Sequence, residues 1–135
     1  MALKKGFRQL LADAQGKAPG ISVQEAQKSL GDASTVFVDI RDVRELEREG
    51  MIPGAFHAPR GMLEFWVDPE SPYYKPVFTE DKTYILYCQS DWRGVLAAAT
   101  LKEMGLPKVL HLEGGYSEWR KAGLPTGARP EKKKD

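Results

Sequence analysis

The chain's single cysteine, Cys88, ends an apolar stretch and is followed closely by an arginine. The segment at positions 84–94 reads YILYCQSDWRG. An ionised thiol in such a place can act as a nucleophile. The planar guanidinium of Arg93 is suited to binding an oxyanion. The residue types and their spacing therefore predict a site that holds a reactive sulfur, or an anion attached to it.

A structural reading of Cys88 competes with the chemical one, because a free cysteine often serves as a small buried apolar residue. The polar loop and the helix expected after it favour the chemical reading. Backbone N–H groups at a helix N-terminus form a cradle for anions and would favour the ionised sulfur. We expect this cradle to be formed by Gln89, Ser90, Asp91, Trp92 and Arg93.

Strand and helix patterns alternate along the chain and would place Cys88 at the end of a strand. Compact β-branched and aromatic runs predict strands at 35–40, 84–88 and 108–115, with a short one near 55–57. Helical patterns fall at 7–14, 22–30, 41–50, 93–105 and 116–123. This alternation predicts an α/β fold, a central parallel β-sheet flanked by α-helices on both faces. Ligands bind at the carboxyl ends of such strands, which is where Cys88 falls.

Composition argues against a nucleic-acid-binding, metal-binding, secreted or membrane-spanning protein. The 135 residues suit one domain, and a net charge of +1 gives no indication of a nucleic-acid partner. One cysteine and two histidines, far apart, form no metal-binding pattern, so we expect no metal and no cofactor. The N-terminus lacks the apolar run of a secretory signal, and no stretch is long enough to span a bilayer. We expect a cytoplasmic protein, a monomer or homodimer, with no membrane partner.

Four sequence blocks resemble the rhodanese-like domain family, in the family's order, from about Ile21 to Pro125. They are the D-x-R strand end (Asp39 and Arg41), the block from Gly50 to Ala55, the Cys88 loop, and the G-G-x-x-x-W block from Gly114 to Trp119. The resemblance implies a rhodanese-like domain at 19–128, after an N-terminal helical extension at 1–18 and before a flexible basic tail at 129–135. It also implies that Cys88 is catalytic and carries sulfur as a persulfide.

The length of the Cys88 loop bears on the chemistry that the resemblance implies. Phosphatases of related fold place five residues between cysteine and arginine, whereas four separate Cys88 from Arg93. The shorter loop resembles that of a sulfurtransferase, which takes sulfur from thiosulfate or a persulfide donor and passes it to cyanide or a thiol. The alternative hypothesis is a non-catalytic or redox/sulfide-sensing interaction module. Phosphatase and arsenate reductase activities are disfavoured.

Asp91 departs from the family, which usually has glycine at this position of the loop. We expect its carboxylate to point partly inward or across the mouth of the loop and to oppose thiosulfate. Arg60 is a further candidate for substrate binding, and His57 is expected to be hydrogen-bonded in a loop. Trp92 is expected to be exposed, where it could contact an acceptor.

The long connection from residue 61 to 80 contains five aromatic residues: Phe65, Trp66, Tyr73, Tyr74 and Phe78. They either pack this connection on the edge of the sheet or form a wall beside Cys88 that selects the acceptor. The sequence leaves both readings open.

Overall fold

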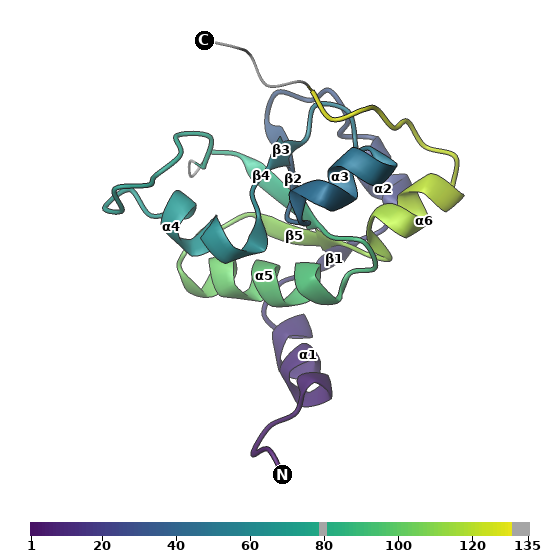
Figure 1. Ribbon diagram of the computed structural model, residues 1–135. Helices are drawn as coiled ribbons and strands as arrows, with labels where there is room; N and C mark the ends of the chain where they lie inside the picture. Colours follow the sequence, from purple (N-terminus) through teal and green to yellow (C-terminus); the bar gives the residue numbers. More distant parts are fainter. Residues whose placement is uncertain (79–80, 131–135) are drawn as a thin grey trace.

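A computed structural model describes residues 1–78 and 81–130, and a twisted parallel sheet lies at its centre (Figure 1). Within these residues the strand order is β1-β5-β4-β2-β3. The strands are β1 (Gly20–Ile21), β2 (Thr35–Asp39), β3 (Phe56–His57), β4 (Thr83–Tyr87) and β5 (Val109–Leu112). Each neighbouring pair is parallel, and β2 and β4 align from Thr35 opposite Thr83 to Asp39 opposite Tyr87. The two central strands therefore end side by side.

Helices cover both faces of the sheet, as Figure 1 shows. The helices are α1 (Phe7–Gln15), α2 (Val23–Gln27), α3 (Val43–Glu49), α4 (Leu63–Val67), α5 (Trp92–Glu103) and α6 (Gly115–Lys121), with a 3-10 turn, η1, at Arg60–Met62. Alternate strand residues face opposite layers. Val38 and Leu86 pack with α4 and α5, whereas Phe37, Ile85 and Tyr87 pack with α2 and α6.

Local sequence explains where the helices beside the site begin. Ser22 accepts a hydrogen bond from the Glu25 N–H and starts α2. Asp42 and Glu45 form a reciprocal capping box at the start of α3. Gly50, at φ 77°, ends α3 and turns the chain towards the next block.

The expected fold class is confirmed: the sheet is parallel and helices lie on both of its faces. The sequence analysis does not predict the strand β1, which has only two residues, Gly20 and Ile21. The strand predicted at 108–115 is shorter, since the chain leaves the sheet at Leu112 and Gly114 takes a positive φ. The helix predicted at 22–30 is regular only to Gln27.

The predicted N-terminal helix is α1, which lies against α5 and away from the sheet (Figure 1). Leu11 and Ala14 pack on Val95, Leu96 and Ala99 of α5. Residues 131–135, most of the predicted basic tail, lie outside the described residues. Among the residues that are described, no helix is long and apolar enough to cross a membrane.

Candidate active site

Cys88 follows β4 directly, and its sulfur lies against the start of α5. The Asp91 N–H donates to the Cys88 Sγ at 3.1 Å, and the Gly94 N–H approaches it at 3.4 Å. The cysteine is only 1% exposed. Backbone N–H groups thus converge on the sulfur from Asp91, which was in the expected set, and from Gly94, which was not, a geometry that stabilises negative charge there.

The G-G-x-x-x-W block holds the other side of the Cys88 loop. The N–H groups of Tyr116 and Ser117 donate to the carbonyls of Cys88 and Gln89, at 2.8 and 3.0 Å. Gly115 has φ 62°, and a Cβ at this position would lie 2.6 Å from the Cys88 carbonyl oxygen. Only glycine allows the start of α6 to approach the loop so closely.

The D-x-R pair lies buried beneath the same loop. Arg41 donates to both carboxylate oxygens of Asp39, at 3.0 and 2.7 Å, and both side chains are fully buried. Its Nη1 donates to the Gln89 Oε1 at 3.0 Å, and its guanidinium lies 4.2 Å from the centre of the Tyr116 ring. The Arg41 side chain therefore ties the end of β2 to the residue that follows Cys88.

Arg93 is paired with a carboxylate that the sequence analysis did not identify. Its Nη1 and Nη2 donate to the two oxygens of Glu45, at 2.8 and 3.0 Å. This bond is the main cause that raises the pKa of Arg93, and charge on the Cys88 sulfur adds to the effect. In turn, Arg93 lowers the pKa of Glu45. The guanidinium thus binds a carboxylate on α3 with both terminal nitrogens and also interacts electrostatically with the sulfur.

The Asp91 carboxylate also has an unforeseen partner. Both of its oxygens lie 3.0 and 2.9 Å from the His111 Nδ1, on β5. We expected this side chain to point partly inward or across the mouth, whereas the structure turns it towards β5 and leaves it 14% exposed. Burial raises the pKa of Asp91, and the His111 hydrogen bond opposes that rise.

The remaining predicted residues lie around the loop or beside it. Ser90 and Trp92 are exposed, and the Trp92 ring lies 5.1 Å from that of Phe7 in α1. His57 Nε2 donates to the Arg41 carbonyl at 2.8 Å, so the expected hydrogen bond is present, although His57 ends strand β3 and does not lie in a loop. Arg60 pairs with Glu64 at 2.7 Å, one helical turn further along the chain. No contact described for Arg60 joins it to the Cys88 loop, so its part in binding stays a prediction.

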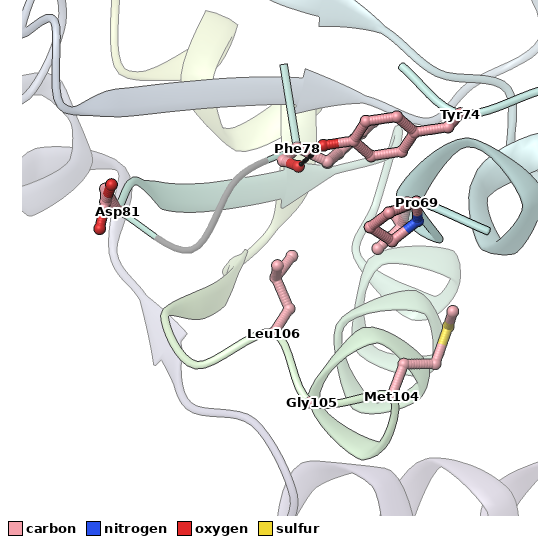
Figure 2. A pocket seen from close by; sticks show the side chains of 8 residues that line it. Pro69, Tyr74, Phe78, Asp81, Met104, Gly105 and Leu106 are labelled. Atoms are coloured by element: carbon pink, nitrogen blue, oxygen red, sulfur yellow. Dashed lines mark hydrogen bonds between the residues drawn. The ribbon is translucent and has the colours of Figure 1, made fainter. Parts of the chain in front are cut away.

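Of the five aromatic residues of the long connection, Trp66, Tyr74 and Phe78 pack on the fold, whereas Phe65 and Tyr73 are exposed. Phe78 is buried, and its ring packs on those of Phe56 and Tyr84, while Trp66 packs on Phe56. Tyr74 and Phe78 border a hollow of about 440 Å³, shown in Figure 2.

That hollow lies at the opposite end of the sheet from Cys88. Its other lining residues include Asp81, which precedes β4, and Leu106, which precedes β5. Both mark the amino ends of parallel strands, whereas Cys88 follows the carboxyl end of β4. A different hollow, of about 340 Å³, borders the loop at Gln89 and is lined also by Glu49, Ser117, Arg120 and Lys121.

Sequence reasoning missed Glu45 and His111. Glu45 already has a local explanation as the third residue of α3 in a capping box, so nothing in the sequence indicates its contact with Arg93, 48 positions away. For His111 a signal was present: a carboxylate where glycine is usual needs a partner if it is buried.

Comparison with known proteins shows which family the chain belongs to. Residues 22–122 match the Rhodanese-like domain family. An uncharacterised protein of Synechocystis is 36% identical over 69% of this chain, and the match spans 47% of that protein, so the chain covers about half its length. A sulfurtransferase of Allochromatium vinosum is 32% identical, over 78% of this chain and 91% of its own.

A solved structure from Rhodopseudomonas palustris is similar over almost the whole chain. It is 45% identical, with a TM-score of 0.91, and covers 94% of this chain and 98% of its own. That protein is described as having unknown function and as a possible tyrosine phosphatase.

Proposed function

The chain belongs to the rhodanese-like domain family, and from this premise we propose that it is a sulfurtransferase that carries sulfur as a persulfide on Cys88. The relative from Allochromatium vinosum is named a sulfurtransferase, which supports rhodanese-type sulfur transfer in general. The observation that carries the proposal is the pair of N–H groups directed at the Cys88 Sγ, at 3.1 and 3.4 Å. They stabilise the ionised Cys88 sulfur before it attacks the donor, and again when the outer sulfur has been removed.

In the first half-reaction, the ionised Cys88 sulfur attacks the terminal sulfur of the donor. A new S–S bond forms to Cys88, the S–S bond within the donor breaks, and its electron pair leaves with the departing group. With thiosulfate the departing group is sulfite, and with an organic persulfide it is a thiolate. Because Cys88 is 1% exposed, the donor must present a terminal sulfur that can reach into the loop.

In the second half-reaction, a thiophilic acceptor removes the outer sulfur. Cyanide or a thiolate attacks that atom, the Cys88 S–S bond breaks, and its electron pair returns to the Cys88 sulfur. No net oxidation or reduction of the protein occurs over the cycle. The two half-reactions share one covalent intermediate, so ping-pong kinetics are expected.

Arg93 and Glu45 bear on the choice of donor. Arg93 presents positive charge near the sulfur, which favours an anionic donor. Glu45, which accepts hydrogen bonds from both terminal nitrogens of Arg93, offsets part of that charge. We therefore propose thiosulfate and persulfides as candidate donors, with the contribution of Arg93 to thiosulfate binding reduced by its partner.

Phosphate chemistry, which the description of the Rhodopseudomonas palustris relative raises, is disfavoured for this chain. The loop has four residues between Cys88 and Arg93, too few to surround a phosphate as phosphatase loops do. Two N–H groups contact the sulfur, and Arg93 already binds Glu45 with both terminal nitrogens.

The proposal is tested by following thiocyanate formation from cyanide, with thiosulfate and with a small organic persulfide as alternative donors. Wild type should turn over at least one of them, with ping-pong kinetics, and Cys88→Ser should show no turnover while keeping its circular dichroism spectrum. Sulfur uptake on Cys88 without release to any acceptor would support the sensing alternative. Hydrolysis of p-nitrophenyl phosphate, lost in Cys88→Ser, with no sulfur transfer would overturn the proposal.

A further inference from the structure

We propose that Asp91 and His111 form a positioning pair, in which His111 holds Asp91 in the backbone conformation that directs its N–H at the Cys88 sulfur. Neither side chain is assigned to the reacting atoms. Their role is to fix the backbone conformation of the Cys88 loop through a side-chain contact between the loop and β5. The consequence for turnover rests on the proposed function, whereas the geometric basis does not.

The first observation is the backbone of Asp91. Among the described residues it is the one non-glycine with a positive φ, at φ 97° and ψ −22°. Residues with a side chain rarely adopt this conformation, so contacts elsewhere must stabilise it. The same residue donates its N–H to the Cys88 Sγ and accepts the Val95 N–H at 2.8 Å in the first turn of α5. One strained residue therefore sets both the sulfur contact and the start of the helix.

The second observation is the enclosure of the carboxylate. The His111 Nδ1 lies 3.0 and 2.9 Å from the two Asp91 oxygens, and the side chains of Asp91 and His111 are 14% and 8% exposed. A carboxylate this far from water needs a donor to stabilise it. Rotating Asp91 into an ordinary backbone conformation would pull its side chain away from His111. The hydrogen bond therefore stabilises the strained conformation.

The third observation is that neighbouring glycines leave room for the pair. A Cβ at Gly94 would lie 3.0 Å from the Asp91 Oδ1, and one at Gly20 would lie 2.9 Å from the His111 Cε1. Glu113 faces the same group, and its like charge adds to the rise in the pKa of Asp91. Residues of β1, β5, the Cys88 loop and α5 all enclose these two side chains. The Asp91–His111 contact is therefore specified by the packing of the fold.

The inference also accounts for the departure from glycine in the loop. Glycine reaches a positive φ without strain and without a partner. Aspartate reaches it here with the help of His111. The two residues should therefore depend on each other: His111 matters only while position 91 carries the aspartate.

A double-mutant cycle tests this dependence by amide hydrogen exchange. The four proteins are wild type, His111→Leu, Asp91→Gly and the Asp91→Gly/His111→Leu double variant. The readout is exchange of the Gly94 amide, which contacts the sulfur and is present in all four. Loss of a hydrogen bond to a charged group should speed this exchange about tenfold or more in His111→Leu. In the Asp91→Gly background, the same replacement should change it less than about twofold.

An equal change in both backgrounds would overturn the inference, because it would mean that His111 supports the fold without acting through Asp91. Exchange of the Leu86 amide, in the middle of β4, is the control for global stability and should follow the unfolding free energy alone. If His111→Leu does not fold, Asp91→Asn and Asp91→Ala replace it. Asparagine keeps an acceptor and tolerates positive φ, so Gly94 protection should hold, whereas alanine should lose it. Equal protection in these two variants would again overturn the inference.

The rate of persulfide formation on Cys88 is measured on the same proteins. It should be lower in those variants in which the Gly94 amide exchanges faster. If wild type forms no persulfide with any donor, the proposed function fails, and the exchange cycle still decides the role of His111.

Discussion

Replacing Arg41 by methionine should destabilise the protein more than any exposed ion pair does, because it leaves a buried charge without its partner. Arg41 donates four hydrogen bonds through its guanidinium: two to Asp39, one to Gln89 and one to the Gly50 carbonyl. Methionine has similar length but provides none of them. Asp39, fully buried, would keep the Arg41 backbone N–H at 3.1 Å.

The expected cost follows from the burial of both partners. Breaking a buried ion pair by removing one member typically costs about 3–5 kcal/mol. That is a large part of the roughly 5–15 kcal/mol by which such domains are stable. With a shift of roughly 4 °C per kcal/mol for a chain of this length, the Tm should fall by about 12–20 °C.

Urea unfolding followed by circular dichroism measures this cost, and Arg44→Ala is the matched control. Arg44 pairs with Asp42 at 2.9 Å, but the two side chains are 79% and 49% exposed, so its loss should cost less than about 1 kcal/mol. The double replacement Asp39→Leu/Arg41→Met should be more stable than Arg41→Met alone, because it removes the unpaired charge. A cost for Arg41→Met no larger than that for Arg44→Ala would refute this account of the buried pair.

Three further predictions concern Arg93, its partner Glu45, and Tyr74 in the long connection. Arg93→Ala should lower kcat/KM for thiosulfate more than for a neutral persulfide donor, and equal losses would mean that Arg93 is structural. Because Arg93 lowers the pKa of Glu45, the pair contributes stability that is present above the ordinary pKa of 4.5 and is lost as the pH falls through the lower folded value. Urea titrations from pH 6 to 3 should therefore show a steeper loss in wild type than in Arg93→Ala; parallel curves would contradict this linkage. Tyr74→Ala, at the far end of the sheet, should lower the Tm without changing acceptor preference, and a changed preference would return Tyr74 to the wall of the site.

Much of the fold could be predicted because its signals are local. The runs at 35–40 and 84–88 contain enough β-branched and aromatic residues to be recognised as buried strands, and their alternation with helical patterns indicates a parallel sheet. By contrast, β1 pairs only Gly20 and Ile21 with β5. A strand of two residues has no periodicity of its own, because its pairing depends on the strand beside it.

The candidate site shows the same division between local and distant contacts. That backbone N–H groups point at the Cys88 sulfur could be predicted, because the sequence itself indicates a short loop that leads into a helix. The partners of Asp91 and Arg93 come from β5 and α3, and only the folded chain brings them there. The Phe7–Trp92 contact is a further case, since nothing in the sequence of α1 indicates that it would pack beside the loop.

Intact-mass measurement of the protein after treatment with a sulfur donor tests the central claim most directly, because the chain has a single cysteine. Wild type treated with thiosulfate or an organic persulfide, then freed of excess donor, should gain the mass of one sulfur atom. Cyanide or dithiothreitol should remove it, and Cys88→Ser should gain nothing. The same gain of mass in Cys88→Ser, or no gain in wild type with either donor, would contradict the assignment of Cys88 as the sulfur carrier.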